Sequence, residues 1–193
     1  MIFTKPLGYE ETEVLPEQSF KRLPKGGYVA KILSVEEQTS RAGNPYLVLN
    51  LDIAEGEYMG FYADDYQKQS GDKKWHFNHR LMVPTNKTKP YTMQLFKTFN
   101  AYLEESNPGF KFDFSMDEKQ YRGKLIGVLV NERQYKKRDG SIGTATNIAK
   151  IVKASTVRNG SYTLPADDLL AASPAEADYI VSDTVEDDDL PFR

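Results

Sequence analysis

The chain has 193 residues, of which 39% are hydrophobic and none is cysteine, and its net charge is −3. This length suits one domain of about 150 residues with tails, and the lack of cysteine excludes disulfides and thiolate metal sites. No apolar run approaches the roughly 20 residues that a membrane-spanning helix needs, and the N-terminus lacks the apolar region of a signal peptide. We therefore expect a cytoplasmic protein without a membrane partner.

The charge is divided unevenly along the chain. Residues 166–193 hold nine acidic residues and one basic residue, a net of −8, whereas the rest holds 24 basic and 19 acidic residues, a net of +5. A basic body with an acidic tail is typical of a polyanion-binding domain with a competing or recruiting arm. Charge alone agrees equally well with a role in solubility.

The first two strands are predicted at residues 28–35 and 46–53, after an irregular N-terminal arm at 1–25 to which we assign no function. Arg41 lies in the loop between them. In the second strand, one face is apolar and predicts core, and it holds Leu47, Leu49, Leu51 and Ile53. The other face holds Tyr46, Val48, Asn50 and Asp52.

A third strand is predicted at residues 75–83 and a helix at 90–105. Between the second and third strands, Tyr62 and Tyr66 are four residues apart and would share one face of a helix. One side of the third strand holds Trp75, Phe77, His79 and Leu81. A basic loop with Lys87 and Lys89 leads to the helix, which starts at Pro90 and carries an apolar stripe that we interpret as core.

Two further strands are predicted at residues 124–135 and 142–152. The dipeptide Asp139-Gly140 between them is a strong signal for a hairpin turn. The same turn holds three adjacent cations, Lys136, Lys137 and Arg138, beside Tyr135.

The order of three strands, a helix and two strands is that of the OB-fold, a small five-stranded β-barrel. We therefore predict a mainly β, OB-fold-like nucleic-acid-binding domain at residues 26–160, with a different α+β sheet as the alternative. In the OB-fold, one sheet face and the loops joining strands 1–2 and 4–5 bind nucleic acid. Those loops carry Arg41 and the cations at 136–138.

Single-stranded nucleic acid offers phosphate charges and unstacked bases, which cations and aromatic rings bind without base-specific hydrogen bonds. Each candidate has a simpler interpretation: the hairpin cations as a solubilising tip, Trp75 as core, and Tyr46, Tyr62 and Tyr66 as packing residues. The candidate binding residues are Arg41, Tyr46, Tyr62, Tyr66, Trp75, Lys87, Lys89, Tyr135, Lys136, Lys137 and Arg138.

Residues 161–193 form an acidic segment with few large apolar groups, for which we predict a disordered protein-interaction tail. It ends in Asp187, Asp188, Asp189, Leu190, Pro191 and Phe192, followed by Arg193. This ending resembles the C-terminal tip of bacterial single-stranded DNA-binding proteins, Asp-Asp-Asp-Ile-Pro-Phe, in which Phe is the last residue. The resemblance implies that the tip recruits replication or recombination proteins; the alternative is a solvated acidic end.

The layout from Gly26 to Lys153 is also similar to that of phage-encoded single-stranded DNA-binding proteins with such a tip. This resemblance implies sequence-independent binding and protection of single-stranded DNA during phage replication and recombination, in the host cytoplasm. It implies neither a cofactor nor an enzymatic activity. A homo-oligomer is possible.

Three other functions are weighed against this interpretation. A metal-dependent nuclease could use His76 and His79 with Asp64 and Asp65, but residues three apart on a strand point to opposite faces. The sequence also has no phosphate loop and no Ser- or Cys-centred nucleophile motif. An RNA-binding module remains open because base stacking does not distinguish the sugar, and so does a protein-only adaptor.

Overall fold

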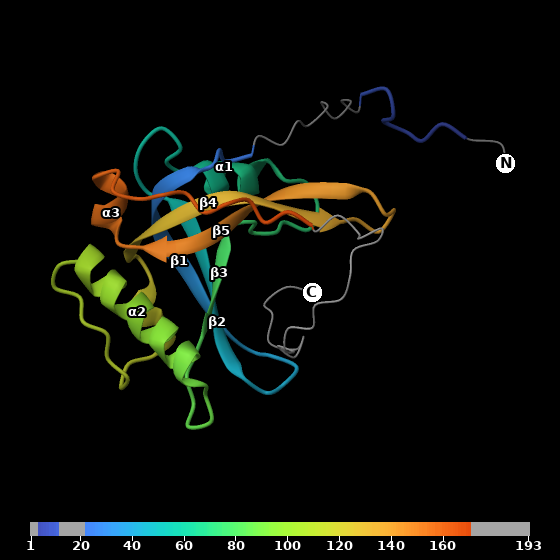
Figure 1. The fold of residues 1–193 in the computed structure, drawn as a ribbon. Coiled ribbons are helices and arrows are strands. Elements are labelled where there is room, and N and C mark those ends of the chain that lie inside the picture. Colours follow the sequence, from blue (N-terminus) through green and yellow to red (C-terminus); the bar gives the residue numbers. More distant parts are fainter. Residues whose placement is uncertain (1–3, 12–21, 171–193) are drawn as a thin grey trace, which may run out of the picture.

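The computed structural model describes residues 4–11 and 22–170 and consists mainly of β-strands (Figure 1). The predicted protein-interaction tip at residues 187–192 lies outside the described residues. Of the helices in the described part of the chain, none is both long and apolar enough to cross a membrane. The strands are β1 (Gly26–Thr39), β2 (Pro45–Ile53), β3 (Asn78–Met82), β4 (Leu125–Lys136) and β5 (Ile142–Val152). The helices are α1 (Phe61–Lys68), α2 (Pro90–Ser106), the 3₁₀ helix η1 (Glu118–Tyr121) and α3 (Ala154–Arg158).

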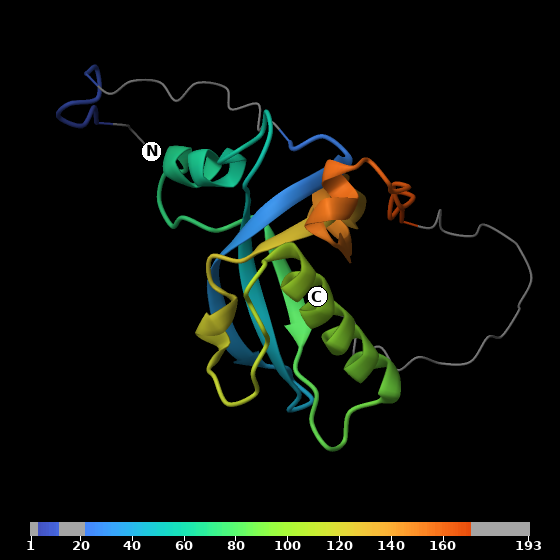
Figure 2. The ribbon, with the colours of Figure 1, turned by 90° about the vertical axis from the view of Figure 1, so that its left-hand side faces the viewer.

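The five strands form one antiparallel sheet in the order β3-β2-β1-β4-β5. This confirms the mainly β fold, the five strands and the long helix between the third and fourth of them. The expectation of a closed barrel is wrong, because β3 and β5 are the two edges of an open sheet and no ladder joins them in the described ranges. Helix α2 contacts β3, β4 and β5 and so spans this opening at one end (Figures 1 and 2).

β1 connects the two halves of the sheet. Its first part, Gly26–Lys31, pairs with β4, and its longer part, from Ala30 to Thr39, pairs with β2. A register shift between Ile32 and Ser34 marks a β-bulge near the point where β1 leaves β4. A bulge bends a strand and increases its twist, so the sheet curves around its core there.

The core lies inside this curve, beneath α2. The predicted inner face of β2 is confirmed, since Leu47, Leu49, Leu51 and Ile53 are all buried. They pack with buried apolar residues of β1, β4 and α2, among them Ile32, Val128 and Leu103. Alternation with period two on a strand and spacing of three to four on a helix place these residues inward.

β3 is shorter than predicted, since it begins at Asn78 rather than at Trp75. Phe77 is 2% exposed, and the indole N–H of Trp75 donates to the carbonyl of Leu51 at 2.8 Å. A longer ladder between β2 and β3 would pair that carbonyl with a backbone N–H. The side chain of Trp75 therefore ends the strand that the sequence pattern would have continued.

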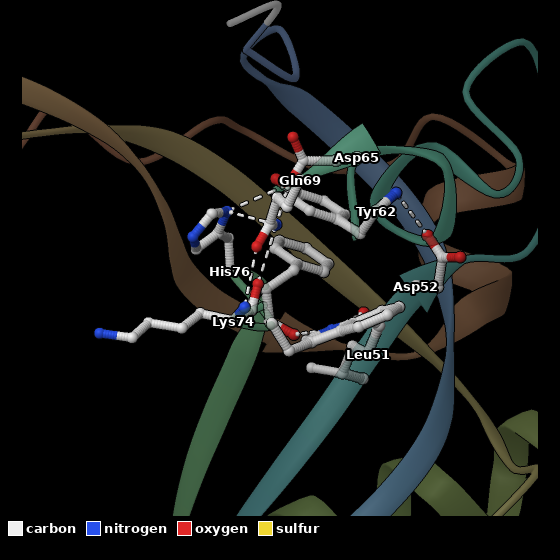
Figure 3. A network of polar contacts seen from close by, with 9 residues as sticks. Leu51, Asp52, Tyr62, Asp65, Gln69, Lys74 and His76 are labelled. Atoms are coloured by element: carbon white, nitrogen blue, oxygen red, sulfur yellow. Dashed lines mark hydrogen bonds and ion pairs between the residues drawn. The ribbon is translucent and has the colours of Figure 1, made fainter. Parts of the chain in front are cut away.

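Asp52 is an exception to the alternation of β2. Its side chain was expected on the outer face, but the residue is 5% exposed. The carboxylate accepts hydrogen bonds from the backbone N–H groups of Ile53 and Tyr62 at 2.8 and 3.0 Å, and from that of Ala63 at 3.2 Å. Figure 3 shows the bond from Tyr62. Because the N-cap residue of α1, Gly60, has no side chain to cap the helix, Asp52 satisfies the first-turn donors instead.

Replacing Asp52 with alanine is expected to lower the free energy of unfolding by about 2–3 kcal/mol, because buried N–H donors lose a charged acceptor. Asp52→Asn keeps one side-chain oxygen and should lose less. Urea denaturation of both variants measures the effect, with Asp64→Ala, an exposed residue of the same helix, as the control. A loss no larger for Asp52→Ala than for Asp64→Ala would contradict this role.

Residues 161–170, assigned to the tail from sequence, lie against the part of β4 that extends beyond its pairing with β1. Asp168 forms a parallel bridge with Arg133, through hydrogen bonds from Gln134 N to Asp168 O at 2.8 Å and from Asp168 N to Glu132 O at 2.9 Å. The Asp167 carboxylate pairs with Lys25 at 2.8 Å and accepts from Glu132 N at 3.1 Å. We call residues 166–168 the β4 strap.

Candidate nucleic-acid interface

The outer face of β2 and β3 carries the first pair of an aromatic ring and a cation. The register sets Tyr46 opposite Met82 and Val48 opposite Arg80, which places Arg80 one diagonal step from Tyr46. The Arg80 guanidinium lies over the Tyr46 ring, 5.4 Å from its centroid, and the Tyr46 hydroxyl donates to Gln38 Oε1 at 2.7 Å. These contacts fix the position of the ring beside a charge that can meet phosphate.

A second pair lies at the end of α1. The rings of Tyr66 and Trp75 are 5.6 Å apart, and Lys73 Nζ lies 5.5 Å from the Tyr66 centroid. Tyr66 is 37% exposed. Trp75 is half-buried, because its indole N–H donates to backbone carbonyls of the core. Of the two, Tyr66 offers more surface to a base.

A network of polar contacts fixes the segment between α1 and β3 (Figure 3). The Gln69 side-chain amide donates to Asp65 Oδ2 at 3.0 Å and to the Lys74 carbonyl at 2.9 Å, and its oxygen accepts from Lys74 N at 2.8 Å. His76 Nδ1 lies 3.1 Å from Asp65 Oδ2. The network ties this segment to α1, and so it positions Trp75 and His76.

The third group is the β4–β5 hairpin. Tyr135 is 44% exposed and lies over Gly143, where a Cβ atom would be 2.6 Å from the ring. Lys136, Lys137 and Arg138 are exposed at the tip. Backbone hydrogen bonds from Lys137 N to Ser141 O and from Gly140 N to Lys137 O close this turn. Gly140 has φ of 83°, as the Asp-Gly signal predicts.

Tyr62 must be removed from the interface. It is 6% exposed, and its ring stacks on Phe77 with centroids 4.3 Å apart. Burial raises the pKa of its hydroxyl above the usual range. It therefore has the packing role that the sequence analysis weighed as its alternative, and no base can reach its faces.

The remaining predicted cations lie at the other end of the sheet. Arg41 is exposed in the β1–β2 loop, and Lys87 and Lys89 are exposed in the loop from β3 to α2. Figures 1 and 2 both show these two loops side by side, away from the β4–β5 hairpin. The structure thus places the predicted cations at two ends, with Tyr46 and Arg80 near the end that holds Arg41, Lys87 and Lys89.

Between the edges of β3 and β5 lies a cavity of about 360 Å³, lined by residues 76–80 and 146–148. We call it the β3–β5 cleft. The half-buried His79 stacks on Phe99 at 6.1 Å, and burial lowers its pKa to about 4. Its imidazole is therefore neutral at pH 7 and acts as an aromatic ring with one donor and one acceptor. The described residues contain no group of three or more His, Asp or Glu side chains that could hold a metal ion.

Sequence reasoning missed Arg80, Lys73 and the cleft. The outward position of Arg80 on β3 could have been read from the alternation, since Phe77, His79 and Leu81 were placed together on one side of the strand and Phe77 and Leu81 are buried. Its position over Tyr46 depends on the register between β2 and β3, which the alternation does not give. The cleft lies between the edges of β3 and β5, and it depends on the curvature of the sheet, which no local pattern gives.

Comparison with known proteins places the chain in a family. No curated protein matches it. Residues 9–141, more than half of the chain, match the family described as "Protein of unknown function (DUF669)". This match covers β1 to β4 and the helices between them. The protein therefore belongs to the DUF669 family.

Proposed function

We propose that the protein binds single-stranded DNA without sequence preference, as a phage-type single-stranded DNA-binding protein. The observation that carries the proposal is the arrangement of three aromatic rings beside cations: Tyr46 with Arg80, Tyr66 with Lys73, and Tyr135 with the cations at 136–138. Two of these groups flank the β3–β5 cleft along one continuous segment, since Arg80 is the last lining residue on its β3 side and Trp75 directly precedes the first, His76.

The sheet order supports an OB-like fold for this purpose. The strand pairs β1–β2, β2–β3, β1–β4 and β4–β5 are present, and pairing of β3 with β5 would join the sheet into a five-stranded ring. The OB-fold is a partly open barrel that binds nucleic acid on the face of strands 2 and 3 and on the loops joining strands 1–2 and 4–5. In this chain that face carries Tyr46 and Arg80, and those loops carry Arg41 and the hairpin cations.

The chemistry favours a single strand over a duplex. Aromatic side chains stack only on bases whose faces are exposed, and such stacking contributes about 1–3 kcal/mol per base. The hairpin cations and Arg41 contact phosphates, which carry no sequence information. Rings beside cations therefore match an unpaired strand, and they require no particular base.

Fluorescence anisotropy with a labelled oligo(dT), its duplex with oligo(dA), and oligo(U) tests the proposal. We expect tightest binding to oligo(dT), and an affinity that falls as salt rises because bound cations release counterions from the phosphates. Equal or tighter binding to oligo(U) would favour the RNA-binding alternative. Failure of the folded protein to bind any oligonucleotide at low salt would exclude the proposal and favour a protein-only adaptor.

We also propose that Phe192 and Leu190 of the acidic tip anchor a replication or recombination protein, with the carboxylates of Asp187, Asp188 and Asp189 steering the encounter. Phe192→Ala is expected to abolish capture of such a partner and to leave oligo(dT) affinity unchanged. Pull-down with purified helicase, primase or recombination mediator measures capture, with Tyr179→Ala in the same segment as the control. Undiminished capture by Phe192→Ala would contradict the anchoring role.

A further inference from the structure

The β3–β5 cleft has the composition of a small polar binding site. Phe77 and His79 supply two rings to its lining, and each ring packs on one side against another aromatic residue, Tyr62 or Phe99. Hydrogen-bonding side chains come from both strands, with Asn78 on β3 and Thr146 and Asn147 on β5. A volume of about 360 Å³ lies at the lower end of the range for small-molecule sites, about 300–1,000 Å³.

A buried hydroxyl next to the cleft lacks a partner. Tyr62 is only 6% exposed, and its hydroxyl makes no hydrogen bond to any described residue. Thr146, which lines the cleft, lies near enough to lower the pKa of that hydroxyl but not in hydrogen-bonding geometry. An unsatisfied buried hydroxyl costs about 1–3 kcal/mol. A polar occupant that bonds to the Tyr62 hydroxyl, or that shifts Thr146 into bonding geometry with it, would remove this cost.

The groups around the cleft point to the kind of occupant. Arg80 is at its mouth and also covers Tyr46, so a strand lying on the outer face of β3 passes directly beside the opening. Thr146 lies three residues along β5 from Gly143, about 10 Å along the strand. The ring of Tyr135 lies over Gly143. The cleft thus lies between two of the stacking positions of the proposed interface.

We propose that the cleft takes one unstacked base of the bound single strand, with the half-buried His79 ring against the base and the side chains of Asn78 and Thr146 at its polar edge. This inference rests on the proposed function and adds a site to it. The Asn78 side-chain amide offers both a donor and an acceptor, so it can match any base by rotation, whereas the Asn147 amide already donates to Asn131 Oδ1 at 3.0 Å. The neutral imidazole of His79 suits a base better than a phosphate, which a cation would bind.

An extended peptide is the competing occupant, because unpaired strand edges are templates for strand addition. The cleft favours a base for two reasons. Its β5 side covers only residues 146–148 and β3 itself has five residues, so the edge is short for a ladder. Its lining also includes the hydrogen-bonding side chains of Asn78 and Thr146, which a base edge can use and strand addition does not need.

The two histidines of the chain, His76 and His79, both line the cleft, which allows a direct test on the full chain. Protein labelled with ¹⁵N and ¹³C at histidine gives two imidazole spin systems. We expect saturating oligo(dT) to shift the His79 ring signals. An abasic deoxyribose-phosphate oligomer of equal length, at saturation, should leave His79 unshifted, because it offers phosphates and no base.

A variant gives an independent measurement. Asn78 is exposed on β3, and Asn78→Leu narrows the cleft and removes its amide. We expect it to weaken oligo(dT) binding about fivefold or more, as for the loss of one base contact, and to leave the affinity for the abasic oligomer unchanged. Val48→Leu, on the outer face of β2 outside the cleft lining, is the control.

The outcomes separate the two proposals. Normal binding of oligo(dT) with an unshifted His79 and an unaffected Asn78→Leu variant would overturn the cleft proposal alone. A shift of His79 with a peptide of residues 184–193, and none with oligo(dT), would show a peptide occupant and overturn it as well. Absence of any oligonucleotide binding would overturn both the cleft proposal and the proposed function.

Discussion

Replacing Lys136, Lys137 and Arg138 by alanine is expected to weaken oligo(dT) binding by tenfold or more at low salt, on the order of the loss of several phosphate contacts. Their side chains are exposed at the tip of a closed hairpin, so the change should leave the fold intact. For single strands, each lost phosphate contact lowers the slope of log K against log salt by about 0.7. Three contacts would therefore lower the slope by about 2.

Anisotropy titrations at several salt concentrations measure both the affinity and the slope. The matched control replaces with alanine Lys111, Lys119 and Arg122, which are also exposed and change the net charge equally. They belong to the segment around η1, which lies on the far side of the molecule from the hairpin in Figure 1. A general effect of charge would weaken both variants alike. If the hairpin variant keeps the affinity and slope of the unaltered protein, the hairpin has no part in binding.

Truncation after Leu170 and truncation after Gly160 are expected to have different effects. Residues 171–193 hold seven acidic residues and one basic residue, a net of −6. If these charges compete with DNA for the basic surface, their removal should raise oligo(dT) affinity at low salt, and the gain should shrink as salt screens the competition. Ending the chain at Leu170 keeps the β4 strap, so stability should be unchanged.

Ending the chain at Gly160 also removes the β4 strap. Asn131 is 4% exposed and donates to the Ala166 carbonyl, and three backbone groups of Glu132 and Gln134 are bonded to Asp167 and Asp168. Losing these partners should lower the free energy of unfolding by about 2–4 kcal/mol. Urea denaturation of both truncations checks this. Equal stability would mean that the strap contributes nothing, and an unaltered low-salt affinity after truncation at Leu170 would mean that the tail acts only on partners.

Repeating patterns in the sequence predicted much of the fold. The alternation of Leu47, Leu49 and Leu51 has the period of a strand buried on one face, and α2 follows the period of a helix from Pro90. The Asp139-Gly140 dipeptide marks the hairpin because the turn needs positive φ. In each case the local pattern and the tertiary structure require the same arrangement, so neighbouring residues carry the information.

The remaining features depend on contacts between distant segments. Asp52 is buried because α1 lacks a side-chain cap of its own, and Trp75 ends β3 because its indole N–H takes a backbone acceptor of β2. Composition suggested that Asp167 and Asp168 are solvated, but Lys25 and the free side of β4 supply their partners. For the candidate site, sequence located the hairpin cations and Tyr46, and the register between β2 and β3 added Arg80.

The bulge in β1 has a mechanical consequence for the cleft. Within the described residues, β1 is the only strand that pairs with both halves of the sheet, β2 with β3 on one side and β4 with β5 on the other. It passes from β4 to β2 close to the irregularity between Ile32 and Ser34. A change in the bend of β1 there would alter the separation of the two free edges, within the limit set at one end by α2, which contacts β3, β4 and β5. The width of the cleft would therefore depend on the curvature of a strand that contributes no residue to its lining.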